Sequence, residues 1–89
     1  MTEQEFKVQN RLGLHARPAA VFVQTTSKFK SSVKVRRGEQ EVDGKSIMGL
    51  MMLAAEEGAE LTIVVNGPDE QDVIQALGAL FSTRFNEKE

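Results

Sequence analysis

The chain has 89 residues, of which 40% are hydrophobic and 27% charged, so it can form one modest core and a single domain spanning residues 1–89. Eleven basic and thirteen acidic side chains give a net charge of −2, which argues against a protein that binds nucleic acid. The absence of cysteine excludes disulfides and thiolate chemistry, and a single histidine excludes a multi-histidine zinc site.

The first half of the chain predicts a strand, a helix and a β-hairpin. Alternating apolar and polar residues predict a strand over residues 4–10. Apolar residues at three- and four-residue spacing predict a helix over residues 16–27, with Pro18 in the first turn, where its missing N–H costs little. Two alternating runs, residues 33–36 and 40–42, are separated by a turn and predict a hairpin.

The second half predicts a short helix over residues 47–53, a strand over 61–65 and a final helix over 70–83. Asp69 precedes the final helix, where we expect its side chain to cap the first turn. The order of these elements predicts an α+β domain with helices on one face of a single sheet. The N-terminus is acidic and polar and no segment approaches the ~20 apolar residues that cross a bilayer, so we expect a cytoplasmic protein without membrane insertion.

Residues 13–20 (GLHARPAA) place the only histidine immediately before a predicted helix. The first backbone amides of that helix, at Ala16 and Arg17, have no acceptor within the helix and form an anion site with the helix dipole. The guanidinium of Arg17 suits a phosphate, and Gly13 leaves room for an incoming group. The arrangement suits a phosphoryl group carried on His15. A surface histidine that caps a helix beside a bound anion, without covalent transfer, is the alternative interpretation.

The same run resembles the active-site signature of the HPr family, the histidine phosphocarriers of the bacterial phosphoenolpyruvate-dependent phosphotransferase system. A second run, residues 44–53 (GKSIMGLMML), also resembles the family, and the likeness covers essentially the whole chain. The resemblance implies a βαββαβα open-faced β-sandwich, with a four-stranded antiparallel sheet and three helices packed on one face.

The resemblance also implies the chemistry and the partners. It implies that His15 accepts phosphate on Nδ1 from enzyme I, ultimately from phosphoenolpyruvate, and passes it to enzyme IIA domains. Arg17 and the amides of Ala16 and Arg17 would stabilise the phosphate. The carrier would need no metal and no organic cofactor, and it would be an intermediate in phosphoryl transfer rather than a stand-alone enzyme.

Ser46 takes a structural and a functional interpretation. A serine immediately before a helix is a good N-cap. In the family, the matching serine is the target of a regulatory HPr kinase/phosphorylase, and a phosphate here would add about −2 charge beside the docking surface.

The short helix after Ser46 is crowded with apolar side chains that cannot all be buried. Leu50 and Leu53 are the better candidates for the core. We expect the others to form an adaptable exposed surface for partners, rather than to fill gaps in the core. Arg11, Arg17 and Lys45 could form a basic rim around it that attracts acidic partners. The predicted docking residues are Ile47, Met48, Met51 and Ala20.

The branch of the family and two competing classes stay open. Leu12 and the chain end (residues 79–81 and 85–87) resemble a nitrogen-related regulatory branch called NPr, whereas residues 42–48 occur in members of mixed function. An enzyme that uses His15 as a general base lacks a second catalytic group, and non-catalytic partner-binding regulators of the family lack the histidine. The tail, residues 87–89, predicts only solvated side chains, and a transiently docking carrier is expected to be a monomer.

Overall fold

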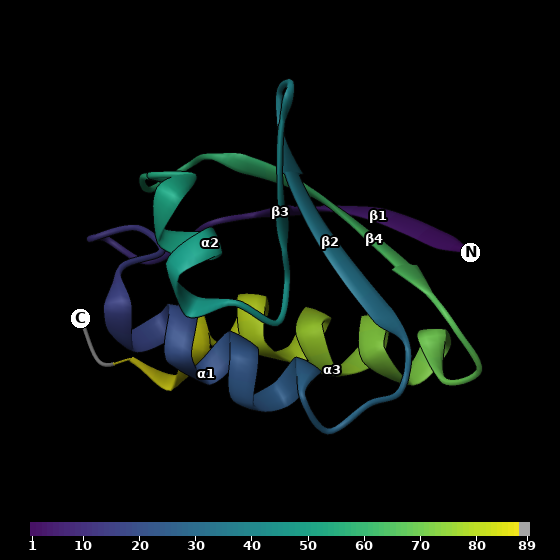
Figure 1. Cartoon of the computed structure of the whole chain (residues 1–89). Helices are drawn as coiled ribbons and strands as arrows, with labels where there is room; N and C mark the ends of the chain where they lie inside the picture. Colours follow the sequence, from purple (N-terminus) through teal and green to yellow (C-terminus); the bar gives the residue numbers. More distant parts are fainter. Residues whose placement is uncertain (88–89) are drawn as a thin grey trace.

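Figure 1 shows a computed structural model of the chain, which describes residues 1–87. The elements, in chain order, are β1 (Thr2–Lys7), α1 (Ala16–Thr26), β2 (Ser32–Arg37), β3 (Gln40–Asp43), α2 (Ile47–Met52), β4 (Glu60–Asn66), α3 (Glu70–Ser82) and a short turn of 3-10 type, η1 (Arg84–Asn86). None of the helices within residues 1–87 is long and apolar enough to cross a membrane.

The four strands form one sheet in the order β1-β4-β2-β3, and every neighbouring pair is antiparallel. The helices α1 and α3 lie side by side under one face of this sheet, and α2 lies beside β3 above α1 (Figure 1). The predicted α+β open-faced β-sandwich is therefore confirmed.

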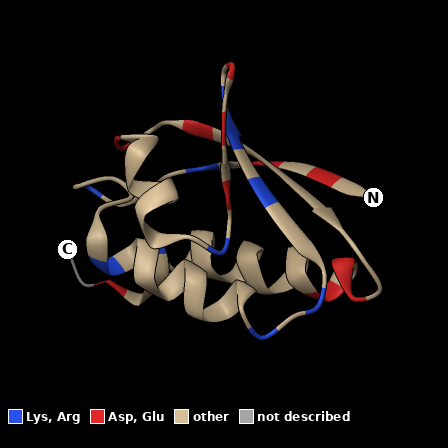
Figure 2. Cartoon of the chain, viewed as in Figure 1, with Lys and Arg blue, Asp and Glu red and all other residues tan. Residues whose placement is uncertain are grey.

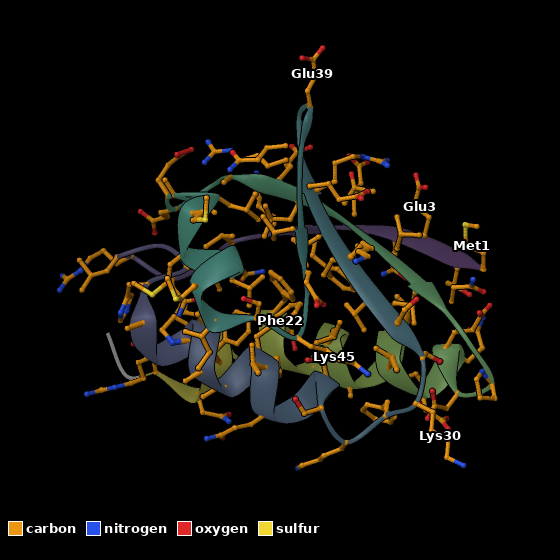
Figure 3. All side chains as sticks on the ribbon, in the orientation of Figure 1. Met1, Glu3, Phe22, Lys30, Glu39 and Lys45 are labelled. Atoms are coloured by element: carbon orange, nitrogen blue, oxygen red, sulfur yellow. The ribbon has the colours of Figure 1, made fainter. Side chains whose placement is uncertain are left out.

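The core lies between the sheet and the helices. The two central strands have a two-residue period because alternate side chains point at the helices, and these side chains are 0–1% exposed. Phe22 of α1, Leu50 of α2 and Leu77 of α3 meet them from the other side with 0% exposure (Phe22 is labelled in Figure 3). Each such side chain contributes about 1.5–3 kcal/mol by leaving water. The inward strand residues are Val33, Val35, Leu61, Ile63 and Val65.

Both ends of the chain differ from the prediction. The β1 ladder runs over Thr2–Lys7, not over residues 4–10, because the pairing with β4 ends where Lys7 faces Glu60. At the other end α3 stops at Ser82, and the chain makes the unpredicted turn η1. All three η1 residues have positive φ (54°, 55° and 62°), a left-handed conformation that non-glycine residues seldom adopt.

The capping role predicted for Asp69 is wrong. Asp69 occupies the N-cap position of α3, but its side chain makes no hydrogen bond to the helix. Its carboxylate instead accepts hydrogen bonds from the Ser31 hydroxyl, the Lys30 N–H and the Ser31 N–H. These bonds, the Ser31 hydroxyl first, lower the pKa of Asp69 from 3.8 to about 2. Asp69 therefore ties the loop before β2 to the start of α3.

Candidate functional site

His15 occupies the N-cap position of α1, with an extended backbone (φ −84°, ψ −168°). Its carbonyl accepts the first helical hydrogen bond from the Ala19 N–H at 3.0 Å. Pro18 has no N–H, so the free donors of the first turn are the amides of Ala16 and Arg17. Within residues 1–87, neither amide donates to a protein acceptor. The predicted anion-binding amides therefore lie beside the histidine, at the positive end of the helix dipole.

A buttressed loop holds His15 in place. Gly13 has a φ of +73°, and the next amide, that of Leu14, donates to the Ala55 carbonyl at 2.8 Å. Ala55 belongs to the loop after α2, which Arg37 of β2 pins by donating to the carbonyl of Ala54 at 2.9 Å. The guanidinium of Arg37 also pairs with Glu56 of the same loop. The position of His15 is therefore held by contacts that reach back to Arg37 at the end of β2.

The imidazole of His15 has one covered edge and one accessible edge. Its side chain is 35% exposed, while Nε2 is buried. Nδ1 is not among the buried atoms and makes no hydrogen bond within residues 1–87, so it is the accessible nitrogen. A shallow pocket beside the ring is lined by Leu12, Leu14, His15, Met51, Ala54, Ala55 and Glu56.

Glu87, which directly follows η1, covers the buried edge of the ring. Its Oε2 lies 3.1 Å from His15 Nε2, and its side chain is only 11% exposed. The prediction of a solvated tail is therefore wrong for Glu87, and residues 88–89 lie outside the described residues. The aromatic residue two positions earlier, Phe85, is a sequence signal that this segment packs on the domain, and it is buried in the structure.

Arg17 is exposed in the first turn of α1, and its guanidinium makes no ion pair within residues 1–87. Figure 2 shows a basic position at the start of α1 and an acidic one in the C-terminal segment at the same end of the molecule. The predicted basic rim is wrong for Lys45, whose Nζ donates to the Phe29 carbonyl at 3.0 Å. Phe29 follows the C-terminal end of α1, and Figure 3 places Lys45 near that end, away from the helix start.

Ser46 is the N-cap of α2, as predicted. Its hydroxyl accepts a hydrogen bond from the Gly49 N–H at 3.0 Å. Leu50 and Leu53 are buried, as predicted. We call the exposed apolar side chains around α2 the methionine patch: Leu12 (70% exposed), Ile47 (40%), Met48 (77%), Met51 (45%) and Met52 (69%). Sequence reasoning missed Leu12 and Met52 as members.

The methionine patch reaches the histidine, because Leu12 and Met51 line the same pocket as His15. Ala20, the remaining predicted docking residue, is half-buried in α1 and lies one turn beyond the helix start. Within residues 1–87 the start of α1 thus carries the histidine, two amides without a protein acceptor and the side chain of Arg17, and the apolar surface borders the histidine.

Comparisons with known proteins agree with this geometry. The family model described as "PTS HPr component phosphorylation site" matches residues 2–83. The "Phosphocarrier protein HPr" of Xylella fastidiosa (strain Temecula1) is 49% identical over 87 residues, which cover 98% of both chains. A crystal structure of HPr-C-His from Thermoanaerobacter tengcongensis has a TM-score of 0.95 and 43% identity, and covers 100% of both chains. A crystal structure of Bacillus subtilis Crh, described as a domain-swapped dimer, has a TM-score of 0.75 and 42% identity over 94% of this chain and 97% of that one.

Proposed function

Since the chain belongs to the HPr family, the phosphocarriers of the phosphotransferase system, we propose that His15 is the residue that carries its phosphoryl group. The observation that carries the proposal is the position of an accessible Nδ1 at the start of α1, beside two amides without protein acceptors.

The chemistry follows from the atoms at this helix start. The lone pair of Nδ1 attacks the phosphorus of the donor, the Nδ1–P bond forms, and the electron pair of the broken donor bond stays with the donor. The amides of Ala16 and Arg17 and the guanidinium of Arg17 then face the phosphoryl oxygens, where they stabilise negative charge. In the transfer to the acceptor, the acceptor nucleophile attacks phosphorus, the Nδ1–P bond breaks, and its electron pair returns to Nδ1 of His15.

We propose enzyme I as the donor and an enzyme IIA domain as the acceptor, as the family implies. Both partners must approach the same accessible edge of His15, and the methionine patch borders that edge. A flexible apolar surface can adapt to two unlike partners, which is what a carrier requires. The carrier acts as a monomer in the cytoplasm in this proposal, because each docking event needs the patch and the ring uncovered together.

Ser46 is a regulatory site in this proposal, and an HPr kinase/phosphorylase would be the third partner. Its hydroxyl lies directly before the methionine patch, where a phosphate would place negative charge at the docking surface. ATP plus that kinase should give an acid-stable label that Ser46→Ala abolishes.

The transfer assay tests the carrier function. Labelled phosphoenolpyruvate, magnesium and purified enzyme I should place an acid-labile, alkali-stable phosphate on the wild-type chain, and His15→Ala should carry none. Added enzyme IIA domains of the sugar type and of the nitrogen type should discharge it at different rates, which assigns the branch. A folded wild-type chain that takes no label, or a His15→Ala chain that takes the same label, would contradict the proposal.

A further inference from the structure

The C-terminal turn brings Glu87 onto the histidine by an unusual path. Phe85 is 2% exposed and packs against Phe22 and Phe81, with ring centroids 6.4 Å and 5.0 Å apart. The three η1 residues on which this packing depends all have positive φ. A left-handed run of this kind persists only where its surroundings hold it, and such strain concentrates at functional sites.

Asn10 holds the carboxylate of Glu87 by a hydrogen bond. Asn10 is 0% exposed, and its Nδ2 donates two hydrogen bonds, one to the Arg84 carbonyl at 2.8 Å and one to Glu87 Oε1. Its Oδ1 is buried without a partner in the described part of the chain. A buried amide left partly unsatisfied is costly, so a position that served packing alone would be better filled by an apolar residue.

We propose that Glu87, held by Asn10, is a positioning residue for His15. The carboxylate uses Oε1 to accept from Asn10 and presents Oε2 to His15 Nε2, 3.1 Å away. Oε2 lies within reach of Nε2 but is not aligned for a hydrogen bond in this structure, as is common for catalytic hydrogen bonds before the reactants bind. An acceptor at Nε2 keeps the proton on that nitrogen and leaves the lone pair on Nδ1.

This role rests on the proposed function of His15 and completes its charge balance. When Nδ1 forms its bond to phosphorus and Nε2 keeps its proton, the ring carries a positive charge. Glu87 then faces that charge with a carboxylate, while the two amides and Arg17 face the phosphoryl oxygens on the other side of the ring. The proton never leaves Nε2, and the donor keeps the electron pair of the bond that breaks.

Glu87→Gln separates this role from simple packing, because it preserves size and removes one acceptor. An amide has a single oxygen, and Asn10 cannot turn to help without losing its bond to the Arg84 carbonyl. The amide oxygen will face Asn10, and its NH₂ will face His15 Nε2, where only the tautomer with the proton on Nδ1 can accept it. The matched control is Glu5→Gln, which makes the same charge change at an exposed position of β1.

Two measurements test the proposal. Two-bond ¹⁵N–¹H spectra of the unphosphorylated chain, at a pH where the ring is neutral, give the tautomer ratio of His15. Glu87→Gln should lower the ratio of the Nε2–H to the Nδ1–H form by about tenfold, the effect of losing one hydrogen bond to a charged acceptor, and Glu5→Gln should leave it unchanged. With enzyme I, kcat for phosphorylation should fall about tenfold with little change in KM, because docking is intact.

A double-mutant cycle links Asn10 to the same effect. If Asn10 acts through Glu87, Asn10→Ala should lower kcat in the wild-type background but add little to Glu87→Gln. A tautomer ratio in Glu87→Gln within twofold of wild type overturns the proposal, even if His15 is labelled normally. A wild type without label on His15 instead overturns the proposed function, and the two failures are thereby distinct.

Discussion

Replacing Gly13 with alanine should destabilise the domain through a specific collision with the loop after α2. Gly13 has a φ of +73°, and an added Cβ would overlap the carbonyl oxygen of Ala55 and lie 3.0 Å from the Cα of Glu56. Both neighbours are backbone atoms, so neither can rotate away. The Leu14 N–H donates to the same carbonyl at 2.8 Å, and any movement that relieves the overlap weakens this bond.

The magnitude follows from three contributions. The left-handed conformation costs a residue with a Cβ about 1–2 kcal/mol, and the weakened backbone hydrogen bond costs about 0.5–1.5 kcal/mol. The stiffer unfolded chain of an alanine variant offsets about 0.4–1 kcal/mol. Adding the strain of moving the loop, we expect Gly13→Ala to lower the free energy of unfolding by about 2–4 kcal/mol. For a domain of this size each 1 kcal/mol lowers Tm by about 4–8 °C.

Urea unfolding, followed by circular dichroism, measures this difference against Gly38→Ala. Gly38 also has a positive φ, +59°, but an added Cβ there meets nothing within 4 Å. Gly38→Ala should therefore cost only the conformational part, about 1 kcal/mol or less. The difference between the two variants isolates the collision with Ala55. If Gly13→Ala is no more destabilising than Gly38→Ala, the buttressing of the histidine loop by Ala55 is refuted.

Three further predictions concern other parts of the molecule. The Ser31 hydroxyl above all lowers the pKa of Asp69 from 3.8 to about 2, so the ionised Asp69 carboxylate stabilises the fold above about pH 4 and this contribution is lost as the pH falls through about 2. Asp69→Asn should therefore reduce the fall of the unfolding free energy between about pH 4 and 2, and an unchanged fall would contradict the assignment. In the same urea titration, Ser46→Ala should lower the free energy of unfolding by about 1 kcal/mol because it removes the N-cap of α2, whereas Ser46→Asn should keep most of that stability. Equal losses of stability in the two variants would argue against capping. Met48→Glu should change the free energy of unfolding by less than about 0.5 kcal/mol, yet weaken the affinity for enzyme I, measured by calorimetry, about tenfold. The control Gln75→Glu, at an exposed position of α3, should not weaken it, and equal affinities of the two variants would exclude a docking role for the methionine patch.

The order of elements and the candidate site at the start of α1 could be predicted because their signals are local. Inward residues of β2 and β4 repeat every second position, which only a strand with one buried face explains. His15, Ala16 and Arg17 are neighbours in the chain, so a correct helix boundary alone places them together. The same holds for Ser46 and the Gly49 N–H that it caps.

The contacts that prediction missed join residues far apart in the chain. Asn10 and Glu87 are separated by 77 positions, and neither neighbourhood contains a pattern that refers to the other. The left-handed turn between α3 and Glu87 includes Arg84 and Phe85, whereas glycine is the usual signal for such a conformation. Asp69 stands at the position of a cap, but its carboxylate accepts hydrogen bonds from Lys30 and Ser31, far away in the chain, instead of from the helix amides.

A pair of ¹H–¹⁵N correlation spectra, before and after phosphorylation by phosphoenolpyruvate and enzyme I, tests the central claim most directly. If the phosphoryl group sits on Nδ1 of His15 at the start of α1, the amide protons of Ala16 and Arg17 should show the largest downfield shifts, because they gain a charged acceptor. Shifts centred on another part of the chain, with these two amides unmoved in a fully phosphorylated sample, would contradict the account.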